Sequence, residues 1–358
     1  MALKTIYCEG CCRLIMLCES DKRMSEVLIH KTRGRVVECI HRGDVVVLGQ
    51  AGQIVASNGD PHKYTFMRSS AKPIQALNVL LSGAAGHYRI SPQELAIICA
   101  SHYAEAMHLD TVRSILAKAG LSEALLQSGK ALSIKPEIAF QQAAEGIKPD
   151  PIHSDCSGKH SGMLITCKHL GLPLENYLDP EHPVQKQIFS IFSEVCAYPG
   201  EEIGVGMDGC NVPVFALPIY HMALAHLRMA NPELLPEKYQ AAATRVFEAM
   251  NAHPEMVGGT GSFCTALMRA TKGRMIGKVG AQGVYCIGVK EPKLGIALKI
   301  EDGGVGMAQM AAMQVLSNLK LLTESEYEAL RSFHHQPNLN DDKHVVGQIR
   351  PVFSLDLK

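Results

Sequence analysis

The sequence predicts an α+β fold in which strands from both ends of the chain form one antiparallel sheet and a helical lobe is inserted between them. Three patterns predict it. Short apolar runs with glycine turns fill residues 26–58, helical patterning extends from about residue 70 to residue 252, and strand signals return near residue 275. We expect the sheet to use residues 24–60 and 255–305, with a functional site in the cleft beside the helical lobe of residues 70–252.

The N-terminal strands are expected to be a meander of short antiparallel strands. Turns that contain glycine, among them Gly34 and Gly43-Asp44, separate the apolar runs. The predicted strands are residues 27–29, 36–40, 45–48 and 54–56.

The helical part begins with a clear start signal. Ser91-Pro92-Gln93-Glu94 is a capping box with proline at the first helical position, and the apolar Ile97 and Ile98 continue the helix. Further helices are predicted at residues 104–119, 160–170, 183–196 and 236–252, most of them opened by proline or closed by glycine.

The C-terminal part returns to strands and then forms one long helix. Strands are predicted at residues 275–276, 284–289 and 295–300, and a helix at 306–320. Met307, Met310 and Met313 repeat every three residues in that helix, which is typical of a packed core stripe. Residues 334–358 are expected to be a loosely ordered tail outside the folded domain.

Residues 1–23 are interpreted as an N-terminal extension. Met24-Ser25-Glu26 immediately precedes the first predicted strand, so we hypothesise that the extension lies outside the folded domain of residues 24–333 and outside the mature protein. Its four cysteines have no second ligand pair at zinc-finger spacing, so a metal knuckle is not favoured there.

Composition excludes several classes of protein. The 358 residues include 35 basic and 35 acidic side chains, so the zero net charge favours neither nucleic acid nor an anionic membrane as a partner. No apolar run approaches the ~18–20 residues that a membrane span needs. The 12 cysteines are scattered and no secretory signal precedes them, which predicts a cytoplasmic protein with reduced thiols.

Two phosphate-binding motifs fail on their context. Gly204 to Gly209 fits G-x-G-x-x-G, but Pro213 lies where the following helix should start, which argues against a dinucleotide site. Gly273 to Lys278 is one residue short of a P-loop.

Ser69 and Lys72 form an S-x-x-K motif at a predicted helix start. Residues i and i+3 share a helix face, so Lys72 is expected one turn above Ser69 and near its hydroxyl. A lysine with a lowered pKa can take the proton of a serine hydroxyl and so make it a nucleophile. The alternative is a helix-capping serine followed by a surface lysine.

The S-x-x-K motif has two companions further along the chain. Serine β-lactamases and penicillin-binding proteins combine S-x-x-K with a second serine and a K-T-G strand. Here Ser101 follows an apolar helix, and Lys278-Val279-Gly280 lies beside the C-terminal strands. The S-D-N triplet is missing, so a true β-lactamase is not indicated.

A second group of residues has metal-binding character. Cys156 and Cys210, with Lys159, His160 and Asp208 as neighbours, could hold a zinc ion, because thiolates favour zinc over magnesium or calcium. Two alternatives stay open: buried thiols beside a tight turn, and a cysteine nucleophile.

Six motifs, taken in order, carry a family resemblance. They are Arg68-Ser69-x-x-Lys72, Cys99-Ala100-Ser101-His102, Cys156-Ser157-Gly158-Lys159-His160, Met207-Asp208-Gly209-Cys210, Gly258-Gly259-Thr260-Gly261 with Cys264, and Lys278-Val279-Gly280-Ala281. Over roughly residues 26–330 the chain resembles the asparaginase II family typified by the rhizobial L-asparaginases. The resemblance implies hydrolysis of L-asparagine to L-aspartate and ammonia, a fold similar to serine β-lactamases and glutaminases, and a homodimer.

The resemblance also implies roles for individual residues. Ser69 with Lys72 and Ser101 with Lys278 match the family's two Ser–Lys pairs. The residues that match its zinc ligands are Cys156, Lys159 and Cys210. The residues that match its substrate contacts are Arg68, His160 and Asp208. Cys264 matches a thiol near the site.

The chain departs from the family pattern at a few positions. Tyr103-Ala104 follows Ser101-His102 where many members have a small polar residue and glycine. Asn211 replaces a frequent glycine, and Gln282 stands where glutamate is common. These departures bear on substrate preference and metal affinity and leave the Ser–Lys pairs intact.

These residues lead to a hypothesis of amide hydrolysis. Ser69, activated by Lys72, attacks the side-chain amide carbon; Ser101 and Lys278 relay protons to the leaving ammonia. Zinc would position the substrate and its surroundings. Two alternatives remain: a glutaminase, whose substrate differs by one methylene, and a non-catalytic amino-acid-binding or zinc-sensing protein of the same fold.

Overall fold

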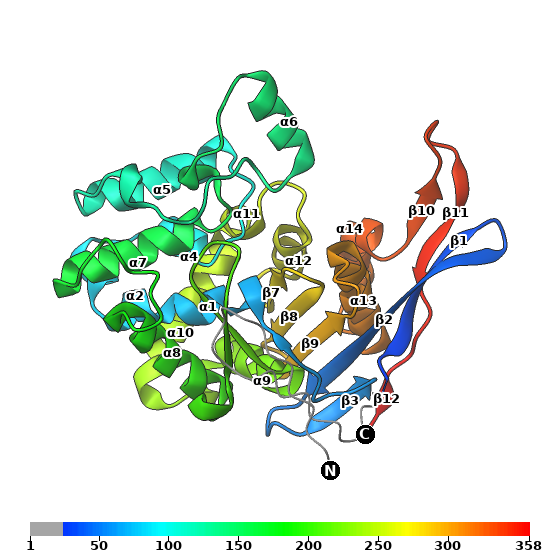
Figure 1. Ribbon diagram of the computed structural model, residues 1–358. Coiled ribbons are helices and arrows are strands. Elements are labelled where there is room, and N and C mark those ends of the chain that lie inside the picture. The colour runs from blue at the N-terminus through cyan, green and yellow to red at the C-terminus, as the bar shows by residue number, and fades with distance from the viewer. Residues whose placement is uncertain (1–23) are drawn as a thin grey trace, which may run out of the picture.

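The computed structural model describes residues 24–358 as one large antiparallel sheet with a helical lobe packed on one of its faces (Figure 1). The strands of this sheet are β1 (Glu26–Arg33), β2 (Val36–Leu48), β3 (Ile54–Asn58), β7 (Met275–Gly280), β8 (Val284–Val289), β9 (Leu294–Ile300), β10 (Gln336–Leu339), β11 (Val345–Pro351) and β12 (Asp356–Leu357). The order across the sheet is β10-β11-β1-β2-β9-β8-β7, with β3 paired to β2 and β12 paired to β3. The predicted α+β fold, with strands from both termini in one sheet, is confirmed.

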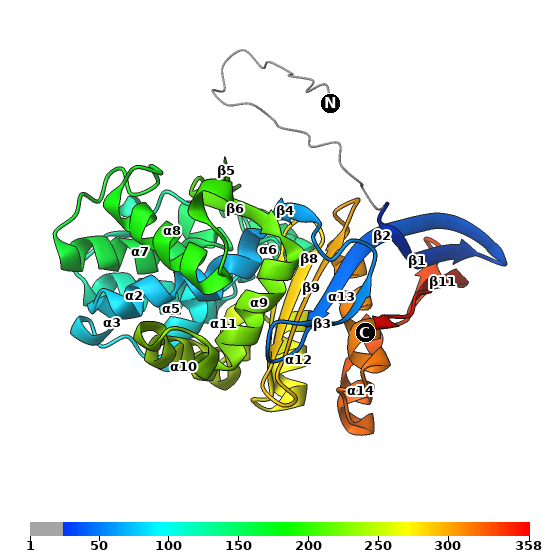
Figure 2. The same cartoon turned by 90° about the horizontal axis from the view of Figure 1, so that it is seen from below.

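Helices cover both faces of the sheet. The helices are α1 (Lys72–Gln75), α2 (Leu77–Leu81), α3 (Ala84–His87), α4 (Pro92–Ile98), α5 (Ala106–Lys118), α6 (Pro136–Ala144), α7 (Ser157–Leu170), α8 (Pro183–Cys196), α9 (Ile219–Ala230), α10 (Glu237–Ala252), α11 (Pro254–Gly258), α12 (Phe263–Thr271), α13 (Val305–Asn318) and α14 (Glu324–Leu330). Figure 2 shows α9 and the helical lobe on one side of the strands, and α13 and α14 on the other. None of the helices in residues 24–358 is long and apolar enough to cross a membrane.

The predicted helix starts and core residues agree with the structure. Ser91 accepts a hydrogen bond from the Glu94 backbone N–H, and the Glu94 carboxylate accepts one from Ser91 N–H, which completes the predicted capping box at α4. Met310 and Met313 on α13 are fully buried, as the core-stripe interpretation requires. The helices predicted near residues 104–119, 160–170, 183–196 and 236–252 correspond to α5, α7, α8 and α10.

Two expectations from the sequence are wrong. Gly43-Asp44 is not a turn, because β2 continues through both residues and Gly43 pairs with Ile300 of β9. A Cβ atom at Gly43 would clash with the Lys299 carbonyl oxygen, so this glycine marks a close approach of strands. The loosely ordered tail of residues 334–358 is instead part of the sheet, since β11 pairs with β1 and β12 with β3.

This C-terminal extension has few sequence signals, because backbone pairing holds it in place more than apolar burial does. Asn338 donates its side-chain amide to the Thr32 carbonyl at 2.9 Å, and most of β11 stays partly exposed. Phe353 is the apolar exception, with 8% of its surface exposed. The expectation that residues 1–23 lie outside the domain concerns residues outside the described part of the chain.

A second, small sheet positions the motif Met207-Asp208-Gly209-Cys210. It has the order β4-β6-β5, with β4 (Tyr64–Phe66), β5 (Gly204–Met207) and β6 (Pro213–Pro218). Residues 208–212 form the turn between β5 and β6, which the sequence patterns did not assign to strands. Asp208 and Cys210 therefore lie on a tight β-turn.

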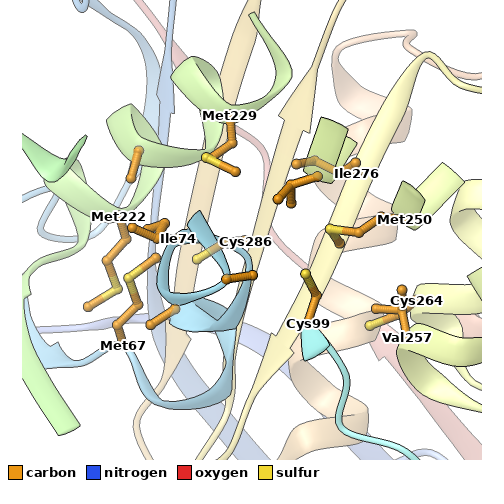
Figure 3. Close-up of a cluster of buried hydrophobic side chains, with 14 of the residues drawn as sticks. Met67, Ile74, Cys99, Met222, Met229, Met250, Val257, Cys264, Ile276 and Cys286 are labelled. Carbon is orange, nitrogen blue, oxygen red and sulfur yellow. The ribbon is translucent and has the colours of Figure 1, made fainter. Parts of the chain in front are cut away.

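The core between the large sheet and the lobe is rich in sulfur. Figure 3 shows methionine and cysteine side chains of this buried cluster, among them Met67, Cys99, Cys264 and Cys286. Methionine and cysteine fill irregular spaces with little strain. The strands and helices that carry the motif residues are thus joined by one packed layer.

Candidate active site

Ser101 is the point at which three parts of the chain meet. It follows α4, and its backbone N–H donates to the Val257 carbonyl of α11 at 2.9 Å. Its Oγ lies 3.1 Å from Lys72 Nζ and 2.9 Å from Lys278 Nζ. All three side chains are buried, so these contacts form away from bulk water. The structure therefore joins Ser101 to both lysines that the sequence motifs singled out.

Lys72, at the start of α1, is surrounded by acceptors. Its ammonium donates to the Ala100 carbonyl at 2.6 Å and lies 3.3 Å from the Asp155 carboxylate. Burial alone would lower the pKa of Lys72, but the negative charges of Asp155 and of the Cys156–Cys210 pair outweigh it and raise that pKa. Lys72 is therefore held as an ammonium ion in this arrangement.

Lys278 has the opposite electrostatic character. It lies on the edge strand β7 with its side chain fully buried. Burial, assisted by the nearby charge of Lys72, lowers the pKa of Lys278 to about 8 even though Cys264 and Asp155 oppose the shift. One of the two lysines that contact Ser101 can thus be neutral near physiological pH while the other is charged.

Ser69 lies in a short 3-10 helix, η1 (Arg68–Ala71), that runs directly into α1. The helix start is pressed against β7, where a Cβ atom at Gly280 would lie 2.7 Å from the Met67 carbonyl oxygen. Ser69 is half-buried, and within residues 24–358 its hydroxyl has no hydrogen-bond partner. Lys72 stands one turn from Ser69 as predicted, but its amine is directed to Ser101 and Asp155.

Arg68, which directly precedes Ser69, forms an ion pair with Asp208. The Arg68 guanidinium donates to Asp208 Oδ1 at 2.9 Å, which joins η1 to the β5–β6 turn. Arg68 has a positive φ of 51°, a conformation that costs energy for a residue with a side chain. The pair is only partly buried, so both charges remain partly accessible to solvent.

Cys156, Lys159 and Cys210 also come together. Lys159 Nζ lies 3.2 Å from Cys210 Sγ, and both are buried between α7 and the β5–β6 turn. A hydrogen bond from Cys156, together with the charges of Lys159 and His160, lowers the pKa of Cys210 against the effect of burial. The same hydrogen bond and burial raise the pKa of Cys156. The two thiols therefore share one proton, with the negative charge on Cys210.

His160, which the family resemblance assigns to the substrate, is a buried side chain close to the thiols, and its role as a substrate contact stays a prediction. The ring is completely buried; Nδ1 lies 2.8 Å from the Tyr177 hydroxyl. Among the described residues, Nε2 has no hydrogen-bond partner at ordinary distance. Burial lowers the pKa of His160, and the charge of Cys210 opposes that shift. The buried His160 ring thus contacts the Tyr177 hydroxyl through Nδ1 and interacts with the charge of Cys210.

Asp155 is a site residue that the sequence reasoning missed. It precedes Cys156 in the chain, and its carboxylate is the negative partner of Lys72. Its backbone carbonyl also accepts from His102 N–H at 3.3 Å. The signal available in the sequence was its place directly before the Cys156 motif, but only the fold brings it against a lysine that is 83 residues away.

Comparison with known families is consistent with this arrangement. The family model described as L-asparaginase II matches residues 29–351. The chain belongs to the L-asparaginase II family. The family description implies an asparagine amidohydrolase. No curated protein sequence matches this member of the family.

Solved structures with a similar course of the chain come from two kinds of protein. A crystal structure of Mglu in its glutamate form has 13% identity and a TM-score of 0.43, covering 78% of this chain and 61% of that one. A β-lactamase from Mycobacterium bovis has 12% identity and a TM-score of 0.39, covering 82% and 95%. A Bacillus glutaminase in 4.3 M NaCl has 13% identity and a TM-score of 0.35, covering 78% and 91%. The chain described here thus spans less than two thirds of the length of the Mglu chain.

The zinc that the family resemblance implies can be tested against the residues present. Within the described part of the chain, no group of three or more His, Cys, Asp or Glu side chains is arranged to hold a metal ion. The group of Cys156, Cys210 and Lys159 offers two soft sulfur donors and one amine instead, and the orphaned Nε2 of His160 lies beside it. This donor set suits zinc in kind, provided that Lys159 loses its proton.

Proposed function

We propose that the protein hydrolyses the side-chain amide of L-asparagine to L-aspartate and ammonia by serine–lysine nucleophilic catalysis. The observation that carries this proposal is the Ser101 hydroxyl held between Lys72 and Lys278 at 3.1 and 2.9 Å, with the unengaged hydroxyl of Ser69 one helical turn from Lys72. Two lysines whose pKa values are shifted in opposite directions are the parts that a proton relay needs.

The relay in this proposal runs through Ser101. With Lys278 neutral, Ser101 gives its proton to Lys278 and takes one from the Lys72 ammonium, a transfer that requires the thiolate charge that raises the pKa of Lys72 to be neutralised first. The neutral Lys72 amine then accepts the Ser69 proton as Ser69 Oγ attacks the amide carbon. The protons return along the same path to the leaving ammonia, and water releases aspartate from the acyl-enzyme.

Other residues hold the substrate and the developing charge. The Arg68 guanidinium suits the α-carboxylate of asparagine, and the Asp208 carboxylate suits its ammonium. The substrate would exchange the Arg68–Asp208 ion pair for contacts of its own. Backbone N–H groups in the first turn of η1 are not used by the helix and can stabilise the oxyanion.

The proposal also includes a zinc ion with a structural role. We place zinc on Cys156, Lys159 and Cys210, and bound there it would neutralise the thiolate charge that raises the pKa of Lys72. His160 would steady Cys210, and Tyr177 would fix the His160 ring. A cytoplasmic location is proposed on the scattered cysteines, and a homodimer on the family resemblance; light scattering measures the oligomeric state.

Ammonia release from L-asparagine and L-glutamine, with and without a chelator, tests the proposal. We expect release from asparagine by the untreated enzyme, with Ser69→Ala reducing turnover to background. The Ser70→Ala variant is the matched control, because Ser70 is the neighbouring serine and its hydroxyl donates only to the Met67 carbonyl. If Ser69→Ala retained most of the turnover while removal of Cys156 abolished it, zinc-hydroxide chemistry would replace this account.

A further inference from the structure

His102, the residue after Ser101, is fully buried and is hydrogen-bonded at both ring nitrogens. Its Nδ1 accepts a hydrogen bond from the Ala104 backbone N–H at 3.1 Å, so the proton of the neutral ring is on Nε2. The Nε2–H group donates to Ser157 Oγ, in the first turn of α7, at 2.8 Å. The fold therefore fixes both the orientation and the tautomer of the His102 ring.

A second contact joins the backbone of His102 to the segment that leads into α7. The His102 N–H donates to the Asp155 carbonyl at 3.3 Å, two residues before the serine that the ring contacts. A Cβ atom at Gly158 would clash with the Ile97 carbonyl oxygen, so the start of α7 packs directly against the end of α4. Because α4 leads into Ser101, the two contacts of His102 fix Ser101 relative to α7.

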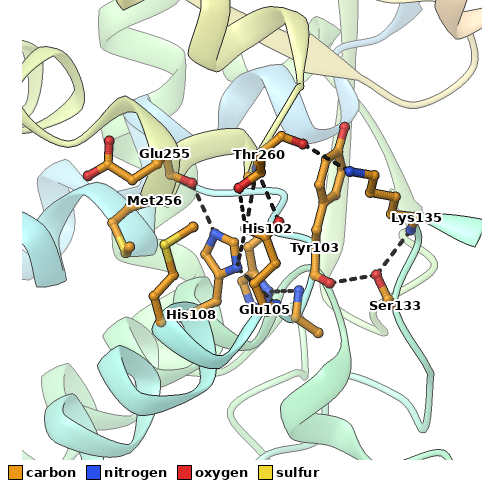
Figure 4. Close-up of polar contacts among 12 residues, drawn as sticks. His102, Tyr103, Glu105, His108, Ser133, Lys135, Glu255, Met256 and Thr260 are labelled. Carbon is orange, nitrogen blue, oxygen red and sulfur yellow. Dashed lines mark hydrogen bonds and ion pairs between the residues drawn. The ribbon is translucent and has the colours of Figure 1, made fainter. Parts of the chain in front are cut away.

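A second buried imidazole, that of His108, stacks on the His102 ring (Figure 4). The ring centroids are 5.2 Å apart and the ring planes differ by 16°. His108 Nδ1 accepts from the Glu105 N–H at 3.1 Å, and Nε2 donates to the Glu255 carbonyl of α11 at 3.0 Å. Burial lowers the pKa of both histidines, that of His102 to about 3, so both rings are neutral at physiological pH. The stack restricts the plane of the His102 ring.

These contacts matter because the Ser101 hydroxyl faces two amines at once. Its Oγ lies 3.1 Å from Lys72 Nζ and 2.9 Å from Lys278 Nζ, and the two lysines belong to α1 and β7. Ser101 itself lies in neither element but in the loop after α4. The attachment of that loop therefore decides where the hydroxyl lies. A misplacement of about 1 Å in a catalytic group can lower a rate about 100-fold.

We propose that His102 is a positioning residue, whose hydrogen bond to Ser157 holds the Ser101 hydroxyl between the two lysines. This inference rests on the proposed amide hydrolysis, in which protons move through Ser101. The His102 ring takes up no proton during turnover, because the Ala104 N–H already occupies Nδ1 and Nε2 already carries a hydrogen. Its contribution is to the geometry of the relay.

Two substitutions of His102 separate the two ends of its ring. An asparagine side chain can accept from the N–H two residues later but is too short to reach Ser157, whereas a glutamine amide can replace the Nε2–H donor. We expect His102→Asn to lower kcat for L-asparagine about 10- to 100-fold and to change KM less than about twofold, since the residues proposed to bind the substrate lie on other elements. His102→Gln should retain most of the wild-type kcat. Loss of kcat that is equal in the two variants overturns the assignment to the Nε2 contact.

Ser157→Ala removes the acceptor of the same hydrogen bond. We expect it to lower kcat about as much as His102→Asn, and we expect the double variant to be no slower than either single one, because both substitutions break one contact. Effects that multiply in the double variant would show that the two side chains act independently, which overturns the proposal. His334→Asn is the matched control: His334 is another buried histidine, and its ring nitrogens contact Tyr327 and Gln314 at 2.9 and 2.7 Å. An equal fall in kcat in this control also overturns the proposal, because the effect would then be general loosening.

Crystal structures of the wild type and of His102→Asn provide a readout that needs no turnover. We expect Ser101 Oγ within hydrogen-bond distance of both lysine amines in the wild type and of at most one in the variant. Ser157→Ala, a smaller change, gives the same comparison if His102→Asn does not fold. An unmoved Ser101 hydroxyl in the variant overturns the positioning role. A displaced hydroxyl in the variant, together with a wild type that releases no ammonia from L-asparagine, defeats the proposed function and leaves the positioning of Ser101 supported.

Discussion

Lys278 and Lys72 contact the same hydroxyl but differ in charge, and the cause is local. Lys72 lies near Asp155 and the two thiols, whereas Lys278 lies in a buried strand facing another cation. Two lysines at similar distances from one oxygen, 3.1 and 2.9 Å, thus acquire different charge states from their surroundings. The sequence motifs located both side chains; they carried no information on which amine would be neutral.

This difference predicts the pH dependence of kcat/KM. The pKa of Lys278 is lowered from its usual 10.5 to about 8, so the neutral amine becomes the main form above pH 8. We expect kcat/KM for asparagine to rise about tenfold per pH unit below pH 8 and to level off above it. Lys278→Met should lower kcat about 10²- to 10⁴-fold and abolish this limb of the profile. A pH-independent rate between pH 6 and 9 would rule out Lys278 as the proton acceptor.

Zinc binding gives a second prediction at the residue scale. We expect one tightly bound zinc per chain, measured by elemental analysis after dialysis, and its loss in Cys156→Ser. Cys167→Ser is the matched control, because Cys167 is a buried thiol on the same helix, α7, but lies about two turns beyond Lys159. Zinc retained in Cys156→Ser, or lost equally in both variants, would contradict the ligand assignment.

At the scale of elements, the C-terminal strands stabilise the sheet that the N-terminal strands begin. β11 continues the sheet on the outer side of β1, and Phe353 inserts its ring into the core. The tail was mispredicted because β10 and β11 lack apolar alternation, so their pairing depends on β1, which is more than 300 residues earlier. Long-range backbone pairing of this kind has no local sequence signal.

This placement predicts a stability effect that a loose tail would not produce. Phe353→Ala should lower the free energy of unfolding by about 2–4 kcal/mol, because a large side chain is removed from a packed position. Leu357→Ala, at a side chain that is 75% exposed, should change it by less than about 0.5 kcal/mol. Urea unfolding of the two variants measures both values. Equal, small effects would mean that the C-terminal segment does not pack as described.

Element prediction otherwise succeeded where the signal was local. Capping at Ser91 and the methionine stripe of α13 depend on spacing within one helix, and both agree with the structure. Gly43 was mispredicted because a glycine at a turn and a glycine at a close approach look alike in sequence. Asp155 was missed for a similar reason: its partner Lys72 is adjacent only in the folded chain.

At the scale of the whole molecule, the site lies where the large sheet, the helical lobe and the small sheet meet. Lys278 comes from the edge strand, Ser69 and Lys72 from the first helices of the lobe, and Asp208 from the small sheet. The sulfur-rich core behind them joins these parts (Figure 3). The zero net charge fits a small zwitterionic substrate, which needs a few local charges and not a field over the surface.

The account's central claim is that Ser69 carries the acyl group during turnover. Acid quenching of the enzyme in the steady state with asparagine, followed by peptide mass spectrometry, locates that group directly. The account predicts an aspartyl ester on the peptide that contains Ser69, its absence in Ser69→Ala, and a lower steady-state amount in Lys278→Met, because that substitution slows the activation of Ser69. An ester on Ser101 or on Cys156, or active turnover by Ser69→Ala without any ester, would contradict it.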